Sequence, residues 1–125
     1  MQRFKNWKKP IFDRGGYAYP NEWPWNGGDI TYGWRCQYNK GLKLGENIDI
    51  GCFSYLNARY GIEIGDNVQI GSHCSIYSDN TENNTHGPVV IGENSLIGSF
   101  CLILPGAIIP PNSKIKAYSI IKGEK

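Results

Sequence analysis

Aliphatic residues recur at every sixth position through most of the chain. The twelve positions of this register are all Leu or Ile, although these two types supply only 22 of the 125 residues. They are Leu44, Ile50, Leu56, Ile64, Ile70, Ile76, Ile91, Ile97, Ile103, Ile109, Ile115 and Ile121. A period of six fits neither an amphipathic helix nor a simple alternating strand, so the pattern predicts a repeat architecture.

The other hexad positions favour very short parallel strands joined by tight turns. The second position is often Gly, and we expect it to supply the backbone freedom that each turn needs. The fifth position is often small, as at Ser54, Cys74 and Cys101, and we expect these side chains to stack inside. Three hexads make one triangular coil, and coils stack at about 4.8 Å, the spacing of neighbouring strands. The prediction is an all-β parallel solenoid.

The sixth positions are expected to face outward, and they change character along the chain. Early ones are polar, whereas later ones are apolar. The later set is Leu96, Leu102, Ile108 and Ile120. Outward aliphatic side chains on a small protein indicate an interface or a groove, which favours an oligomer.

The register breaks twice. Two extra residues predict a bulge around Tyr60 to Glu63, between the hexads that start at Leu56 and Ile64. A surplus of nine residues, Glu82 to Val90, predicts a loop extruded from one corner of the coil. Loops on a rigid scaffold often carry function, so this loop is a candidate for the active site.

The first forty residues differ from the rest in composition. All four Trp lie there, and Pro residues and Gly-Gly pairs interrupt every helical window. We interpret residues 1–40 as an aromatic-rich cap over the open end of the solenoid and residues 41–125 as the β-helix domain. The alternative is an aromatic platform for a sugar ring, and the two roles are compatible.

Charge and hydropathy exclude several classes of function. A net charge of +2 does not favour a nucleic-acid partner. No apolar stretch approaches the roughly 18 residues of a transmembrane segment, and no apolar run follows the basic start as in a signal peptide. We therefore expect a cytoplasmic protein. The four cysteines lack CxxC spacing and are expected to be reduced and mostly buried.

Two segments resemble a known family: IGDNVQIGSHCSIYS (residues 64–78) and PVVIGENSLIGSFCLILPGAIIPPNS (residues 88–113). They are similar to the hexapeptide-repeat acyltransferases of left-handed parallel β-helix fold, above all the small sugar O-acetyltransferases and their capsule and O-antigen relatives. The resemblance implies a homotrimer that uses acetyl-CoA and needs no metal. The implied acceptor is a hydroxyl or amine of a sugar, nucleotide-sugar or glycan precursor.

The resemblance also implies roles for particular residues. Ser99 and Ala117 match positions that lie along the pantetheine arm of coenzyme A. Lys122 stands where the family has a threonine that contacts coenzyme A. Asn57 matches an asparagine that touches the acceptor sugar. The family's catalytic histidine has no counterpart, because its place at the end of IYSDNT is taken by Thr81.

Transfer of an acetyl group to a hydroxyl needs a base, and His is the usual one because its pKa lies near neutrality. The chain has two candidates. His86 lies in the extruded loop, which we expect to approach a neighbouring subunit and present His86 to the groove beside Ser99. His73 is expected to face outward from its hexad. Asp79 is a candidate for orienting a histidine or binding a sugar hydroxyl.

Two alternatives to the acetyltransferase stay open at this point. A γ-class carbonic anhydrase needs three His around zinc, and this chain has only two. A non-catalytic trimeric scaffold or binding protein is the remaining alternative, favoured if the replacement of the family histidine by Thr81 abolishes activity.

Overall fold

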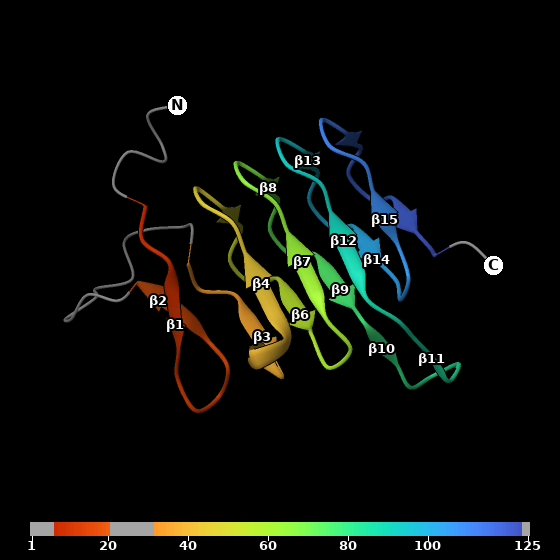
Figure 1. The fold of residues 1–125 in the computed structure, drawn as a ribbon, viewed down its shortest axis with the longest axis horizontal. Helices are drawn as coiled ribbons and strands as arrows, with labels where there is room; N and C mark the ends of the chain where they lie inside the picture. Colours follow the sequence, from red (N-terminus) through yellow and green to blue (C-terminus); the bar gives the residue numbers. More distant parts are fainter. Residues whose placement is uncertain (1–6, 21–31, 124–125) are drawn as a thin grey trace.

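The computed structural model describes residues 7–20 and 32–123, and its main body is a left-handed parallel β-helix of three sheets (Figure 1). The first face is formed by β4 (Leu42–Leu44), β7 (Ile62–Ile64), β12 (Val89–Ile91) and β15 (Ile108–Ile109). The second face is formed by β5 (Asp49–Ile50), β8 (Gln69–Ile70), β13 (Leu96–Ile97) and β16 (Lys114–Ile115). The third face is formed by β3 (Arg35–Gln37), β6 (Tyr55–Asn57), β9 (Ser75–Tyr77), β14 (Leu102–Ile103) and β17 (Ile120–Ile121).

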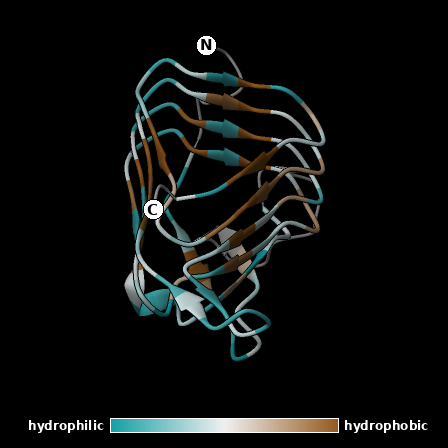
Figure 2. Ribbon diagram, turned by 90° about the vertical axis from the view of Figure 1, so that its right-hand side faces the viewer, coloured by the Kyte–Doolittle hydropathy of each residue, from teal (hydrophilic) through white to brown (hydrophobic). Residues whose placement is uncertain are grey.

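The aliphatic register forms the core. On the second face Ile50, Ile70, Ile97 and Ile115 pair in that order from coil to coil. Ile70 and Ile97 are each 1% exposed, which confirms the predicted register. Hydrophobic residues recur at corresponding places of successive coils (Figure 2). Burying each such side chain contributes about 1.5–3 kcal/mol.

The small fifth-position residues also stack as predicted, at the corner between the second and third faces. Ser54, Cys74 and Cys101 are each at most 2% exposed. Their side chains form hydrogen bonds to backbone carbonyl groups of the turns. The Cys74 thiol donates to the Gly98 carbonyl at 3.2 Å, and the Ser54 hydroxyl donates to the Gly71 carbonyl at 3.0 Å.

The hexad glycines act differently from the prediction. The hexad glycines at the second position do not have positive φ; the left-handed residues of the turns are two positions further on, as at Asn67 and His73. At Gly71 a Cβ atom would lie 2.6 Å from the backbone nitrogen of Ser99 in the next coil. Glycine is therefore required here by close approach between coils rather than by φ.

The described part of the N-terminal segment packs against the first coil. Strands β1 (Pro10–Phe12) and β2 (Ala18–Pro20) form an antiparallel pair. Phe12 packs edge-on against Trp34, which is 2% exposed, and the Trp7 indole donates to the Ile48 carbonyl at 2.7 Å. Trp23 and Trp25 lie outside the described residues. Strand β3, followed by the short 3-10 helix η2 (Asn39–Gly41), already belongs to the third face ahead of residue 41.

The extruded segment is a hairpin whose limits differ from the predicted loop. Strands β10 (Asp79–Asn80) and β11 (Thr85–His86) pair antiparallel. Val89 and Val90, assigned to the loop from the sequence, instead pair with Ile62 and Glu63 of the first face. Val89 is fully buried, because an apolar residue next to the core gains more from joining the sheet than from solvent exposure.

Candidate functional site

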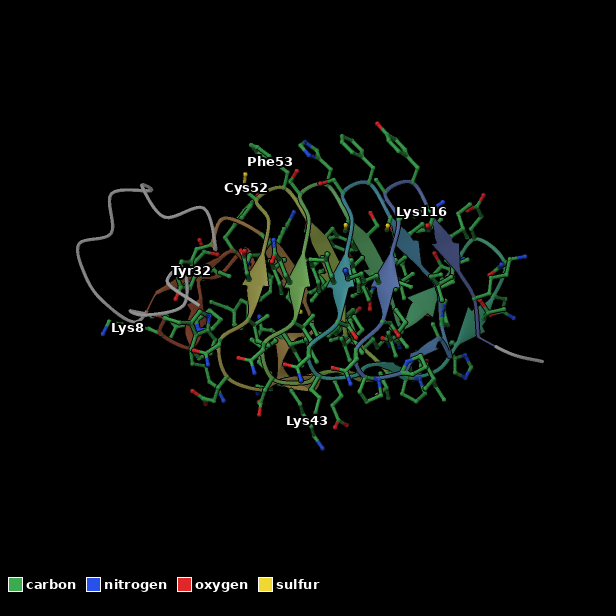
Figure 3. The ribbon with its side chains drawn as sticks, turned by 90° about the horizontal axis from the view of Figure 1, so that it is seen from above. Lys8, Tyr32, Lys43, Cys52, Phe53 and Lys116 are labelled. Carbon is green, nitrogen blue, oxygen red and sulfur yellow. The ribbon has the colours of Figure 1, made fainter. Side chains whose placement is uncertain are left out.

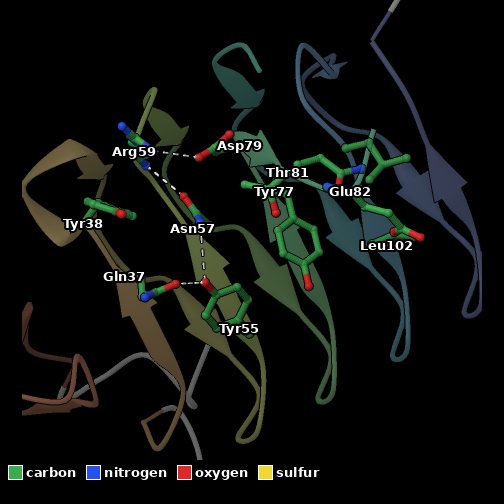
Figure 4. A pocket seen from close by; sticks show the side chains of 12 residues that line it. Gln37, Tyr38, Tyr55, Asn57, Arg59, Tyr77, Asp79, Thr81, Glu82 and Leu102 are labelled. Carbon is green, nitrogen blue, oxygen red and sulfur yellow. Dashed lines mark hydrogen bonds and ion pairs between the residues drawn. The ribbon is translucent and has the colours of Figure 1, made fainter. Parts of the chain in front are cut away.

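An open groove of about 550 Å³ lies on the third face, beside the corner where the hairpin leaves the β-helix (Figure 4). Strands β3, β6 and β9 supply its wall, and the hairpin supplies its rim. It is lined by Gln37, Tyr38, Tyr55, Asn57, Arg59, Tyr77, Asp79, Asn80, Thr81, Glu82, Leu102 and Leu104. The structure therefore brings together Asn57 and Asp79, the two residues predicted to bind the acceptor.

A chain of hydrogen bonds crosses the groove wall. The Tyr55 hydroxyl donates to the Gln37 side-chain carbonyl and accepts from the Asn57 amide at 3.5 Å. The Asn57 side-chain oxygen accepts from the backbone N–H of Arg59 at 3.1 Å. Burial raises the pKa of the Tyr55 hydroxyl, so it stays protonated at neutral pH. Both ends of the Asn57 amide are engaged, which fixes its orientation in the wall.

The contacts that hold the hairpin to the β-helix include an ion pair and a ring stack. Arg59 Nη1 lies 3.4 Å from Asp79 Oδ2, and the Asp79 side chain is only 12% exposed. Tyr60 stacks on the His86 ring with centroids 4.4 Å apart, and the Arg59 guanidinium lies 5.5 Å from the same Tyr60 ring. These contacts come from the corner that carries the two extra residues, so the bulge provides the support for the hairpin.

Each predicted base has a defined position. His86 lies opposite Asp79 in the β10–β11 pair, is exposed, and does not line the groove. His73 is exposed at the corner between the second and third faces, stacked on Phe100 with centroids 4.7 Å apart. The two histidines therefore stand at opposite ends of the third face. Thr81, which takes the place of the family histidine, lines the groove.

The predicted coenzyme A residues divide into two groups. Ser99 and Ala117 lie in neighbouring coils at the same corner as His73, where the backbone N–H of Tyr118 donates to the Ser99 carbonyl at 3.1 Å. Lys122 follows β17 at the opposite end of the third face and is exposed. Within one chain the structure thus brings Ser99 and Ala117 together, while His86 and Lys122 lie across the face from them.

Sequence reasoning did not single out Gln37, Tyr55, Arg59 or Tyr77 as site residues. Three groove residues share one register, because Gln37 pairs with Asn57 and Asn57 with Tyr77. These three residues each follow the inward-facing residue of their strand. Comparing the residues at this one position from coil to coil would have indicated a polar and aromatic surface on the third face.

Two features are absent from the described residues. Across residues 7–20 and 32–123, no three His, Cys, Asp or Glu side chains gather as a metal-ligand set. In that same part of the chain no helix has the length and apolar character needed to cross a lipid bilayer.

The coil geometry defines a β-helix protein built on hexapeptide repeats. Residues 88–123 match the family model described as bacterial transferase hexapeptide (six repeats). The matched segment begins just before β12 and continues past β17, so it includes the last strands of all three faces. This part of the chain is thus similar to the hexapeptide repeats of bacterial transferases. No curated protein and no solved structure gives a significant match to the chain.

Proposed function

We propose that this protein is an acetyl-CoA-dependent acetyltransferase that modifies a hydroxyl or amine of a sugar, nucleotide-sugar or glycan precursor. The observation that carries the proposal is the match of residues 88–123 to the hexapeptide transferase model. That match favours an acyltransferase over the non-catalytic scaffold. We place the reaction in the cytoplasm, where acetyl-CoA is available.

The groove on the third face suits a sugar acceptor. The rings of Tyr55 and Tyr77, with centroids 5.6 Å apart, offer flat apolar surfaces to the C–H groups of a pyranose. Asp79 and Asn80 offer oxygen atoms and an amide that bind hydroxyl groups. We assign acceptor binding to Asp79 and to the wall that Asn57 orders.

We propose a homotrimer, which the separation of the predicted groups within one chain supports. Ser99 and Ala117, assigned to the pantetheine arm, occupy one corner, whereas His86 occupies another. A neighbouring copy that offers its hairpin to the Ser99 corner would join the two halves of a site between subunits. Leu96 is 41% and Ile108 72% exposed, and Leu102 is half-buried, so each has surface left for such a contact.

The proposed chemistry is acyl transfer. His86 takes the proton from the acceptor hydroxyl as its oxygen attacks the thioester carbonyl. The tetrahedral intermediate then collapses, the C–S bond breaks, and the proton passes to the departing sulfur to give free coenzyme A. His73 is the second candidate for the base. Lys122 is assigned to the coenzyme A phosphates as a positive charge near the end of the β-helix.

The test is release of the coenzyme A thiol. Purified protein is incubated with acetyl-CoA and a panel of sugars, and thiol release is followed with a colorimetric thiol reagent. We expect acceptor-dependent release, and stabilisation by a few degrees in a thermal shift with coenzyme A. The matched control is the double variant Ser99→Tyr/Ala117→Tyr, which would block the pantetheine path and abolish both signals. No thiol release and no thermal shift would contradict the proposal.

A further inference from the structure

The acceptor groove extends along the stack of coils. Its lining residues come from four successive strands of the third face, β3, β6, β9 and β14, and from the turns beside them. Neighbouring strands lie about 4.8 Å apart, so the groove crosses three such steps, or about 14 Å. Its volume of about 550 Å³ falls among the clefts of about 300–1,000 Å³ that hold drug-sized ligands with several rings. A groove of this length and volume has room for more than one sugar ring.

Tyr38 lies at one end of this groove, beyond the rings of Tyr55 and Tyr77 (Figure 4). It is 52% exposed. The Arg59 guanidinium lies 5.6 Å from the centroid of the Tyr38 ring, and the same guanidinium is paired with Asp79. Tyr38 therefore offers a second aromatic surface next to the residues assigned to the acceptor.

The backbone of Tyr38 distinguishes it from the equivalent residues of the following coils. The register of the third face makes Ala58 and Ser78 the equivalents of Tyr38 in the next two coils. Both are small and fully buried. Tyr38 instead has a left-handed backbone, with φ 56° and ψ 46°, which bulky residues rarely adopt. Packing between coils does not require an exposed ring here, and unfavourable backbone of this kind is concentrated at ligand-binding positions.

The charge of the groove favours an uncharged ligand. Arg59 is the one cation among the described residues that line the groove, and it is already paired with Asp79. Glu82 adds a second carboxylate at the rim. The diphosphate of a nucleotide-sugar would need cationic partners rather than a second carboxylate. Most of the other lining residues carry amide or hydroxyl groups, which bind the hydroxyl groups of a sugar.

We propose that the acceptor is an uncharged oligosaccharide that lies along the groove. The sugar unit that receives the acetyl group lies beside Asp79, and the next unit stacks its C–H face on the Tyr38 ring. Tyr38 is thus a specificity-determining residue that distinguishes a chain of sugars from a single sugar. The inference rests on the proposed function and deepens it, because it names which of the sugar acceptors the groove takes.

The test compares acceptors of one, two and three sugar units in two series, glucose to maltotriose and N-acetylglucosamine to triacetylchitotriose. Affinity is measured by NMR titration without acetyl-CoA, and kcat/KM is measured by thiol release with it. In at least one series we expect both to rise by about three- to tenfold from one unit to two, as expected of one aromatic stacking contact. Saturation-transfer difference NMR should show that the second unit contacts the protein.

Two variants of Tyr38 separate the ring from the backbone. Tyr38→Asn removes the ring and keeps a residue that tolerates the left-handed conformation, so we expect an unchanged circular dichroism spectrum. It should reduce the gain from the second unit to within about twofold of unity. Tyr38→Phe keeps the ring and should keep the gain.

The matched control is Phe53→Asn. Phe53 is 72% exposed with φ 68°, so the substitution removes an exposed ring from the same kind of backbone. Phe53 protrudes from the edge of the molecule (Figure 3) and does not line the groove. Phe53→Asn should therefore keep the wild-type gain from the second sugar unit.

Several results would overturn the inference. These are a gain below about twofold in every series that the protein binds, a Tyr38→Asn variant that keeps the gain, a Phe53→Asn variant that loses it, or a wild type that binds no member of either series. Tighter binding of UDP-glucose than of any chain would assign the groove to a nucleotide-sugar instead.

The two readouts keep the inference apart from the proposed function. Single sugars that are acetylated as efficiently as the chains would contradict the Tyr38 subsite and leave the proposed function standing. Chains that bind with the expected gain but release no coenzyme A would contradict the proposed function and leave the Tyr38 subsite standing.

Discussion

At Gly71 the next coil passes so close that no side chain fits. A Cβ atom there would lie 2.5 Å from Ser99 Oγ and 2.6 Å from the Ser99 backbone nitrogen. Gly98 repeats the situation one coil later, 2.5 Å from the backbone nitrogen of Ala117. The repeated glycine is thus a consequence of stacking, and its cost in unfolded-chain entropy is offset by close packing between coils.

We therefore expect Gly71→Ala to destabilise the protein by about 1–3 kcal/mol, because the backbone of the next coil must shift. Denaturant unfolding measures the change. Gly15→Ala is the matched control, since its nearest contact would be an ordinary 3.4 Å from Tyr17. Equal stability of the two variants would show that neighbouring coils do not constrain Gly71.

The cysteines should differ in reactivity. Burial raises the pKa of the Cys36 thiol to about 12, and burial is also the main cause that raises the pKa of Cys74. Cys52 is only half-buried. Since the thiolate is the reactive form, we expect iodoacetamide at pH 8 to label Cys52 well before the other three. Peptide mass spectrometry reads the sites, and labelling of all four in guanidinium is the control. Early labelling of Cys36 would contradict its burial.

The same pKa predicts how stability depends on pH. Unfolded Cys36 ionises near its ordinary value of about 9, whereas the folded thiol stays neutral up to about 12. The unfolded state therefore loses its proton first, so the stabilisation is complete below pH 9 and is lost as the pH rises toward 12. Unfolding followed from pH 8 to 11 in the wild type and in Cys36→Ala should show a steeper decline for the wild type.

At the scale of elements, the hairpin is the part where we expect substitutions to cost the least stability. It lies outside the coil stack, and the described contacts that tie it to the β-helix include the Arg59–Asp79 pair and the Tyr60–His86 stack. Partly exposed ion pairs contribute little to stability, so these contacts chiefly set position. We therefore expect changes in this region to affect the proposed transfer activity more than folding.

If His86 is the base, His86→Ala should lower turnover by about 10²–10⁴-fold with little change in affinity for coenzyme A. His73→Asn is the comparison, because asparagine keeps the left-handed turn, and it should do much less. Turnover is followed by thiol release at saturating acceptor, with the sedimentation mass checked for both variants. The opposite ranking would assign the base to His73. If neither variant slowed transfer, either the acceptor is an amine or the protein is no acetyltransferase.

At the scale of the molecule, stability comes from coils that cover one another. Ile97 has a coil on each side, paired with Ile70 and Ile115, and is 1% exposed. Ile121 of the last coil is only partly buried. The interior is thus best protected in the middle of the stack, as expected of a solenoid.

We expect Ile97→Ala to cost about 2–5 kcal/mol of unfolding free energy, since it opens a cavity between covered coils. Ile121→Ala should cost clearly less, because its surroundings relax more easily and less surface returns to water. Chemical denaturation at one temperature compares the two. A larger loss for Ile121 would mean that the last coil is better covered than the single chain shows.

The sequence by itself determined the coil, because an interior position such as Ile70 or Cys74 obeys a local rule that repeats every six residues. It also located both breaks in the register, although not the limits of the hairpin. Only the tertiary structure decided which outward residues meet: Arg59 with Asp79, Tyr60 with His86, and Phe100 with His73. Outward side chains follow no packing rule along the chain. Their neighbours depend on coil length, which the bulge and the hairpin alter, and on the return of Val89 to the first face.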